Sequence, residues 1–379
     1  MNPVAVSVIV PTYREADNLP VLVPRLATAL KQAGLSFEII IVDDNSPDAT
    51  AQVCADLATQ HPVRLEVRTA ERGLSSAVVH GMNLARGDVL VCMDADLSHP
   101  PEKVAELVKT LDDGADFVIG SRYVRGGTTA EGWGLFRWLN SKVATLMAWP
   151  LTATSDPMAG FFAIGRDTFQ AARNLDPIGY KIALELLVKC RCKDVREVPI
   201  HFENRLHGAS KLSFKEQVNY LRHLKRLYEF KFGALARLAQ FLLVGGTGMV
   251  VDLAFYVLLL GWLPLGAARG LAIWAAMTWN YWLNRRITFS FARGRAVLPQ
   301  YLMFCLSCGL GAVVNWTTSM ALSNLLTIFG GRPLLAAVVG IIAGSIFNFI
   351  LCNTAVFRRA KPAPVPQPDP VGEPVLESQ

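Results

Sequence analysis

The C-terminal part of the chain contains four long apolar segments, which constrain the fold more than any other feature. They span Ala236–Leu263, Ala267–Leu283, Tyr301–Ile328 and Leu334–Val356. A transmembrane helix needs ~20 mostly apolar residues, and each segment is near or above that length, although the second is marginal. We therefore predict an all-α domain of four transmembrane helices at residues 234–360, followed by a disordered Pro-rich tail at 361–379.

Basic residues are distributed unequally around these segments. Seven basic residues lie between the second and third segments or after the fourth: Arg285, Arg286, Arg293, Arg295, Arg358, Arg359 and Lys361. The other connections contain two, Arg269 and Arg332. Because cytoplasmic loops are enriched in Lys and Arg, we expect both termini in the cytoplasm. Nothing like a signal peptide precedes the first apolar run, so we expect the N-terminal domain on the same side. The chain is then a multi-pass protein of the cell (plasma) membrane.

The apolar half also contains an internal repeat, which indicates a duplicated pair of helices. Gly246, Gly248, Val250, Val251 and Asp252 recur 63 residues later as Gly309, Gly311, Val313, Val314 and Asn315, and Asn280 and Phe289 recur 68 residues later as Asn348 and Phe357. Duplicated units are familiar in transporters. An acidic residue such as Asp252 in a membrane span suggests a function, while hydrogen bonding between helices is an equal alternative.

The N-terminal half alternates short β-type runs with amphipathic helical stretches. The expected strands are Val6–Val10, Phe37–Val42, Leu65–Val67, Val89–Met93, Asp116–Gly120 and Val195–Ile200, and the expected helices include Asp17–Gln32, Pro47–Gln60, Ser75–Ala85 and Pro101–Asp112. This alternation predicts an α/β domain at residues 1–212, Rossmann-like with a mostly parallel sheet.

Polar segments follow three of these strands. Pro11–Glu15, Asp43–Pro47 and Asp94–Ser98 should meet at the edge formed by the carboxyl ends of the strands, where such sheets bind ligands. Asp94 and Asp96 stand where an apolar run stops, and Mg²⁺ or Mn²⁺ held by one or two carboxylates keeps positions open for substrate phosphates. The Asp43–Pro47 segment taken alone fits a turn and helix cap equally well.

Composition excludes several functional classes. The net charge of +6 could suggest nucleic acid, but the basic residues cluster beside apolar spans, which favours an anionic membrane surface as partner. The seven cysteines are scattered and suit neither a disulfide framework nor a zinc site.

Residues 213–233 alternate Leu and Tyr with Arg and Lys, which predicts an amphipathic helix in the headgroup region of a membrane. An ordinary solvated surface helix is the alternative.

Seven motifs in order resemble those of GT-A glycosyltransferases of family 2, and more narrowly dolichol-phosphate mannosyltransferases (polyprenyl-phosphate β-mannosyl transferases). They are Pro11–Glu15, Val42–Asp48, Arg72–Ala77, Met93–Pro101, Gly120–Tyr123, Asp156–Phe162 and Arg205–Leu212, and they cover nearly all of residues 4–230. The segment Thr278–Phe289 is similar to GtrA-like four-helix membrane domains.

The resemblance implies a role for individual residues. It assigns the nucleotide sugar to Pro11, Tyr13, Glu15, Val42, Asp44, Asp94, Ala95, Arg205 and Lys211; the metal to Asp96, with Asp94 and Ser98; and the acceptor phosphate to Arg122, Arg137 and Ser141. Asp96, Arg122 and Arg137 are thereby the candidate catalytic residues. Ser98 stands where relatives often have an amide, so its metal contact could pass through water. An alternative for Arg137, in an aromatic segment, is a membrane-surface anchor.

The implied reaction is transfer of mannose from GDP-mannose to a polyprenyl (dolichyl) phosphate with inversion, assisted by Mg²⁺ or Mn²⁺. The acceptor already carries roughly −1.5 to −2 charges at pH 7, so it needs no general base, and arginine suits its phosphate. Two alternatives remain: transfer of glucose from UDP-glucose, and a lipid flippase or scaffold with a nucleotide-binding domain. No Gln-x-x-Arg-Trp motif of a processive synthase occurs. The sequence leaves the oligomeric state open.

Overall fold

The computed structural model describes residues 4–130, 135–172, 174–176, 178–204, 214–325 and 333–358. The chain forms two compact units, Met1–Lys231 and Phe232–Gln379. The predicted tail at 361–379 and the connection with Arg332 lie outside the described residues.

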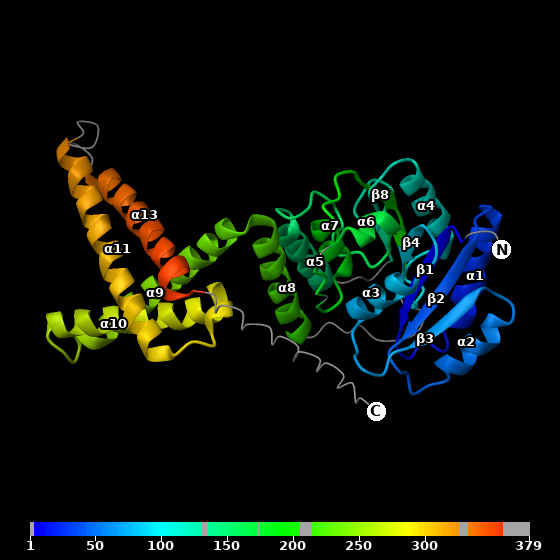
Figure 1. Ribbon diagram of the computed structural model, residues 1–379, viewed down its shortest axis with the longest axis horizontal. Coiled ribbons are helices and arrows are strands. Elements are labelled where there is room, and N and C mark those ends of the chain that lie inside the picture. Colours follow the sequence, from blue (N-terminus) through cyan, green and yellow to red (C-terminus); the bar gives the residue numbers. More distant parts are fainter. Residues whose placement is uncertain are drawn as a thin grey trace, which may run out of the picture. The chain divides into compact units, whose positions relative to one another are not determined.

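A seven-stranded sheet forms the centre of the first unit (Figure 1). Its strands are β1 (Val6–Thr12), β2 (Phe37–Asp43), β3 (Val63–Val67), β4 (Val89–Cys92), β5 (Phe117–Ser121), β7 (Phe162–Gly165) and β8 (Val195–Pro199). The order is β3-β2-β1-β4-β7-β5-β8, and every neighbouring pair is parallel except those that include β7. The mostly parallel sheet is therefore confirmed.

The antiparallel strand β7 is the main departure from the predicted elements. It is four residues long and inserts between β4 and β5, so the residues before it reach the edge where the parallel strands end. A short apolar run of this kind gives no periodicity that distinguishes a strand from a buried helix. A second small sheet pairs β6 (Thr128–Thr129) with β9 (His201–Phe202).

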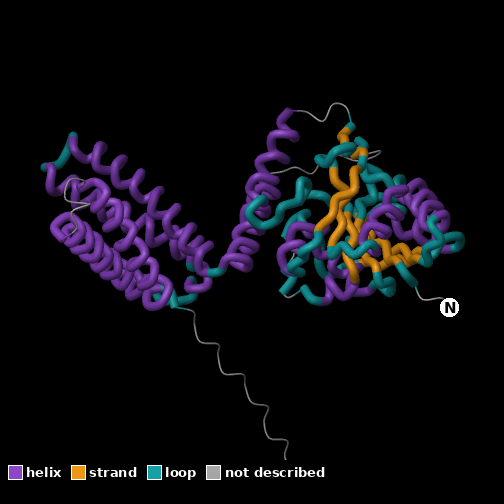
Figure 2. Tube along the Cα trace, turned by 90° about the horizontal axis from the view of Figure 1, so that it is seen from above, coloured by secondary structure: helices purple, strands orange, loops and turns teal. Residues whose placement is uncertain are grey.

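Helices cover both faces of the large sheet, as Figure 2 shows. One face packs against α1 (Leu19–Gln32), α2 (Thr50–Ala58) and α4 (Val104–Asp112); the other packs against α3 (Leu74–Leu84), α6 (Arg166–Gln170) and α7 (Ile182–Lys189). Alternate residues of β1 serve the two cores, since Val8 lies in the first and Ile9 in the second. Burial on both faces explains why these strands are apolar throughout.

Two further helices, α5 (Leu135–Ala148) and α8 (Phe214–Phe232), complete the first unit. The Tyr220 hydroxyl of α8 donates to the Ala144 carbonyl of α5 at 2.6 Å, and Leu224 and Leu227 of α8 are buried. The predicted amphipathic helix thus exists, and its inner face packs on the first unit. Leu221 on the same helix is half exposed, and its contact with a membrane stays a prediction.

The second unit consists of α9 (Ala234–Leu260), α10 (Leu265–Leu283), α11 (Val297–Leu325) and α13 (Pro333–Leu351). Three helices in the described part are long and apolar enough to cross a membrane by length and composition: Ala234–Leu260, Val297–Asn324 and Val338–Val356. The predicted second span, α10, is a helix but is not among them, because Arg269, Asn280 and three tryptophans lower its hydropathy. That α10 crosses a membrane remains a prediction.

The glycines and asparagines of the predicted repeat occupy matching positions in this unit. Gly248 of α9 lies against Asn280 of α10, where a Cβ atom would be 2.2 Å from the amide oxygen. Gly311 of α11 lies against Asn348 of α13, where the corresponding distance to the Asn348 Cβ is 3.1 Å. Small residues let membrane helices approach closely. Each hairpin therefore uses the same glycine–asparagine contact.

The ends of the two hairpins also match. A π-helical turn follows each hairpin, at Asn284–Thr288 and at Cys352–Val356, and each turn is followed by a phenylalanine. The rings of Phe289 and Phe357 stack on each other with centroids 4.6 Å apart and an interplanar angle of 7°. Two equivalent residues in mutual contact are expected of duplicated units that pack with approximate twofold symmetry. The structure thus supports the predicted duplication.

The acidic residue in the first hairpin has a partner. The Arg269 guanidinium of α10 donates to the Asp252 carboxylate of α9 at 2.7 Å and lies over the ring of Tyr256. Pairing of this kind is how membrane proteins reduce the cost of an intramembrane acid. Asp252 therefore joins α9 to α10, which agrees with the helix-contact alternative.

Candidate active site

A cavity of about 1280 Å³ lies where the parallel strands of the first unit end. Tyr13 follows β1, Asp44 follows β2, Asp94 and Asp96 follow β4, and Arg122 follows β5; all line this cavity. The strand order reverses direction between the adjacent strands β1 and β4, and ligands of open α/β sheets bind at such a switch point. The three polar segments converge as expected.

The structure brings most of the predicted site residues together. Those that line the cavity are Pro11, Tyr13, Glu15, Asp44, Asp94, Ala95, Asp96, Arg122 and Ser141. Val42 is fully buried in the core against α3, so only its backbone could contact a nucleoside. Arg205 and Lys211 lie outside the described residues, as does the side chain of Arg137, whose backbone belongs to α5.

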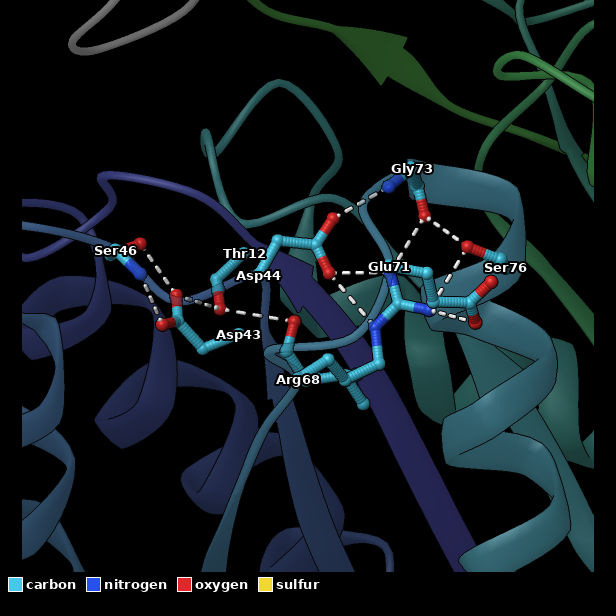
Figure 3. Close-up of polar contacts among 9 residues, drawn as sticks. Thr12, Asp43, Asp44, Ser46, Arg68, Glu71, Gly73 and Ser76 are labelled. Atoms are coloured by element: carbon cyan, nitrogen blue, oxygen red, sulfur yellow. Dashed lines mark hydrogen bonds and ion pairs between the residues drawn. The ribbon is translucent and has the colours of Figure 1, made fainter.

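The two aspartates at the carboxyl end of β2, Asp43 and Asp44, have different environments (Figure 3). Asp43 accepts hydrogen bonds from the backbone N–H and hydroxyl of Ser46 at 2.7 and 2.6 Å, which closes the turn after the strand. Asp44 accepts from the Arg68 guanidinium, with Nε at 2.8 Å, and from the Gly73 N–H at 2.8 Å. Arg68 is almost fully buried and also donates to the Gly73 carbonyl at 3.1 Å. Asp44 therefore fixes the loop before α3 as one wall of the cavity.

The loop after β4 presents its two carboxylates to the cavity. The side chain of Asp94 is about one third exposed at 29%, and Gly160 lies so close that a Cβ there would be 3.0 Å from Asp94 Oδ2. Asp96 Oδ1 accepts from the backbone N–H of Ser98 at 3.1 Å and from its hydroxyl. Ser98 is buried and does not line the cavity, so its contact orients Asp96. Direct metal ligation by Ser98 stays a prediction.

His99 belongs to the scaffold of this loop. Its ring packs against those of Phe161 and Phe202 with centroids 5.3 Å away in both cases. Nδ1 accepts a long hydrogen bond of 3.4 Å from the Asp94 N–H, and burial lowers the pKa of the imidazole despite the nearby charges of Asp94 and Asp96. A neutral imidazole in this position holds the backbone of the carboxylate loop.

Arg122 is held by a buried acid that sequence reasoning did not assign. Asp156 has no exposed surface and accepts two parallel hydrogen bonds, from Arg122 Nε and Nη2, both at 2.7 Å. Burial alone would lower the pKa of Arg122, but the hydrogen bonds and charge of Asp156 raise it above its usual value. Glu197 of β8 in turn accepts from the Ser155 N–H at 2.9 Å. This chain of contacts fixes the guanidinium at the cavity wall.

Ser141, on α5, is linked to the same region. Its hydroxyl lies 2.8 Å from the Tyr123 hydroxyl, and the Arg122 guanidinium lies over the Tyr123 ring at 5.2 Å. Two of the three residues predicted for the acceptor phosphate, Arg122 and Ser141, are therefore connected through Tyr123.

One cationic residue in this cavity, Lys181, was not predicted from the sequence. Lys181 lies at the N-terminal end of α7 and lines the cavity, and its ammonium is 3.5 Å from the Met158 carbonyl. Burial, followed by the charge of Arg122, lowers the pKa of Lys181 to about 8. The segment Ile178–Lys181 follows no expected strand, which is why position along the chain did not indicate a site.

The residues present fit a divalent cation. Among the described residues there is no group of three or more His, Cys, Asp and Glu side chains that could hold a metal ion, and Asp94 and Asp96 are the carboxylate pair of one loop that lines the cavity. Oxygen donors from one or two carboxylates are what Mg²⁺ takes in phosphate-binding sites, where waters and substrate phosphates complete its coordination.

Comparison with known proteins identifies both parts of the chain. Residues 7–172 match the family model "Glycosyl transferase family 2", and residues 240–357 match "GtrA/DPMS, transmembrane domain". The dolichol-phosphate mannosyltransferase of Pyrococcus furiosus is 39% identical over 354 residues, which cover 91% of this chain and 97% of that protein. That of Mycosarcoma maydis is 46% identical over 237 residues, covering 60% of this chain and 81% of that protein.

Comparison with solved structures gives two matches of lower identity. Mannosyl-3-phosphoglycerate synthase from Rubrobacter xylanophilus has 20% sequence identity and a TM-score of 0.46, covering 59% of this chain and 74% of that one. Glucosyl-3-phosphoglycerate synthase from Mycobacterium tuberculosis, solved with Mn²⁺ and UDP-glucose, has 17% identity and a TM-score of 0.46, covering 60% and 78%. The family models and the full-length relative decide the classification: the chain belongs to the dolichol-phosphate mannosyltransferase family and is a glycosyltransferase with a GtrA/DPMS transmembrane domain.

Proposed function

We propose that this enzyme transfers mannose from GDP-mannose to a dolichyl or other polyprenyl phosphate, which yields a β-mannosyl phosphoryl lipid and GDP. The observation that carries the proposal is the meeting of the Asp94–Asp96 loop and Arg122 in one cavity. A carboxylate pair for a metal–diphosphate and an arginine for a second phosphate are the groups that such a transfer needs. The relative from Pyrococcus furiosus is named a dolichol-phosphate mannosyltransferase, which supports mannose as the transferred sugar and dolichyl phosphate as the acceptor.

The donor end of the cavity is built from Tyr13, Glu15 and Asp44, where we place the nucleoside. Asp96, held by Ser98, and Asp94 would bind Mg²⁺ or Mn²⁺. The bound cation would supply neutralising charge to the leaving diphosphate. Arg205 and Lys211 are proposed to add charge-assisted contacts to the same diphosphate.

Arg122, with Arg137 and Ser141, is proposed to bind the acceptor phosphate. Because a phosphate monoester is already anionic at pH 7, its oxygen attacks the anomeric carbon without a base to deprotonate it. The protein's task is then to hold two negatively charged groups close together and aligned, and Asp156 keeps Arg122 in place for this. Attack opposite to the departing diphosphate converts an α-linked donor into a β-linked product.

We place the reaction at the cytoplasmic face of the cell membrane, with both termini on that side. The arginines between α10 and α11 support this orientation by the positive-inside rule. The lipid chain of the acceptor would remain in the bilayer while its phosphate enters the cavity. The partially exposed Leu221 on α8 suits a position near the membrane surface.

The test is a transfer assay with full-length protein in detergent or liposomes and a polyprenyl phosphate acceptor. GDP-mannose and UDP-glucose are offered in parallel, each with Mg²⁺, with Mn²⁺ and with chelator. Metal-dependent mannosyl lipid from GDP-mannose alone is the expected result. Glucosyl lipid from UDP-glucose would replace the donor assignment, and no lipid-linked sugar from either donor would contradict the enzymatic proposal in favour of a scaffold or flippase.

A further inference from the structure

The acceptor phosphate needs more positive charge than Arg122 can give in this structure. One edge of its guanidinium is occupied by Asp156, which accepts two parallel hydrogen bonds from Nε and Nη2, both at 2.7 Å. The charge of Arg122 is thereby balanced by a fully buried carboxylate. An acceptor with roughly −1.5 to −2 charges would therefore meet in Arg122 a cation that is already paired.

Lys181 lies in the same cavity and has no such partner in the part of the chain that the structure describes. Among the described residues, no carboxylate oxygen lies within 4.0 Å of its ammonium, and its hydrogen bond to the Met158 carbonyl is long at 3.5 Å. A half-buried ammonium without an ion pair is unfavourable, and the pKa of about 8, lowered by burial and by Arg122, reflects this. A bound anion would relieve that cost, and a lysine serves phosphates as a point charge.

The surroundings of Lys181 indicate which phosphate it would bind. The segment before it touches α8, since a Cβ on Gly179 would lie 3.0 Å from Glu216 Oε2. The cavity wall contributed by α5 and α8 includes the apolar side chains of Val143, Met147 and Leu221. An acceptor that carries an apolar chain would bring its phosphate in along this wall. The donor nucleoside instead belongs with Tyr13 and Asp44, at the ends of β1 and β2.

We propose that Lys181 binds the phosphate of the lipid acceptor and supplies the charge that the Arg122–Asp156 pair withholds. This inference rests on the proposed function. Four charged groups act on Lys181: Arg122, Asp156, Asp94 and Glu216. Since the Asp156 charge is taken up by Arg122, the Lys181 ammonium would gain an ion partner in the incoming phosphate.

The experiment compares Lys181→Met and Lys181→Arg with Lys109→Met, which changes an exposed lysine of α4. In Lys181→Met the KM for polyprenyl phosphate should rise roughly 10- to 100-fold, the effect of losing a charge-assisted hydrogen bond. The KM for GDP-mannose should change less than about twofold, the size of experimental scatter in such comparisons. Lys181→Arg should recover most of the acceptor affinity, and Lys109→Met should match the wild type.

Binding measurements separate the possible failures. GDP binding in the presence of Mn²⁺ and farnesyl phosphate binding are each measured by calorimetry for all variants. Loss of GDP binding in Lys181→Met, a raised KM for GDP-mannose, or an unchanged KM for the acceptor would overturn the assignment. If the wild-type protein transfers no sugar, the proposed function fails, whereas weaker farnesyl phosphate binding by Lys181→Met would still uphold the role of Lys181.

Discussion

Replacing Asp156 by asparagine should destabilise the first unit strongly and displace Arg122. The carboxylate has no exposed surface and accepts from Arg122 Nε and Nη2 at 2.7 Å and from the Arg122 backbone N–H at 3.2 Å. An asparagine can accept with one oxygen only, so its amide group would face a guanidinium N–H as a second donor. The change leaves a buried cation without its counter-ion.

The magnitude follows from burial. Removing one partner of a buried ion pair costs about 3–5 kcal/mol, and each kcal/mol shifts the melting temperature of a domain of this size by about 2–4 °C, so the expected drop is roughly 6–20 °C. The matched control is Asp194→Asn, because the pair of Asp194 with Arg196 leaves 45% and 39% of the two side chains exposed. Such exposed pairs contribute about 0–1 kcal/mol.

The assay must report on the first unit alone, since the chain has two. Cys92 of β4 is buried in the sheet, so alkylation of its thiol after brief heating, quantified by peptide mass spectrometry, measures opening of that unit. Asp156→Asn should expose Cys92 at a clearly lower temperature than Asp194→Asn does. A loss of 1 kcal/mol would lower the melting temperature by about 2–4 °C. If both variants open within about 2 °C of the wild type, the reasoning about the buried pair is refuted.

Three further outcomes are expected. Asp96→Ala should reduce metal-dependent transfer more than about 100-fold while the protein stays folded, and retained activity would refute the metal assignment. Gly344→Ala should destabilise the second unit by about 1–3 kcal/mol, because the new Cβ would lie 2.6 Å from the Gly311 carbonyl oxygen. The control Gly309→Ala should leave the stability unchanged, because no atom lies within 4 Å of a Cβ at that position. Equal melting temperatures of the two variants would contradict this packing. Burial lowers the pKa of His223, so the folded state favours the neutral ring and the stability of the protein should fall as the pH drops below about 6.5. The variant His223→Gln should lose less stability than the wild type between about pH 7.5 and 5.5. An identical pH dependence of the two proteins would disprove the role of this ring.

The sequence predicted the carboxylate loop because its signals are local. An apolar run that stops at Asp94, with Asp96 two residues on, already indicates a strand end with oxygen ligands, and parallel strands bring such ends to one edge. The helices of the second unit could also be predicted, because the length of an apolar segment can be read directly from the sequence. The same holds for the repeat, because the spacing of Gly248 and Asn280 from their counterparts is a property of the sequence alone. The second segment was predicted to be marginal in length; α10 has 19 residues, and its lower hydropathy rather than its length sets it apart from the three helices that are apolar enough to cross a membrane.

What only the tertiary structure decided are contacts between segments distant in the chain. Asp156 reaches Arg122, 34 residues away, because the antiparallel strand β7 inserts between β4 and β5 and returns the chain to the site edge. Lys181 lies in the cavity because α7 packs on the sheet, and no sequence motif predicts this position. The amino-acid sequence by itself determined most of the parallel strands, the long apolar helices and the acidic loop that we propose to hold the metal, since short-range periodicity sets these. Which charges are paired and which remain available for a substrate depended on strand order and helix packing, because pairing requires side chains from separate elements to share one buried space.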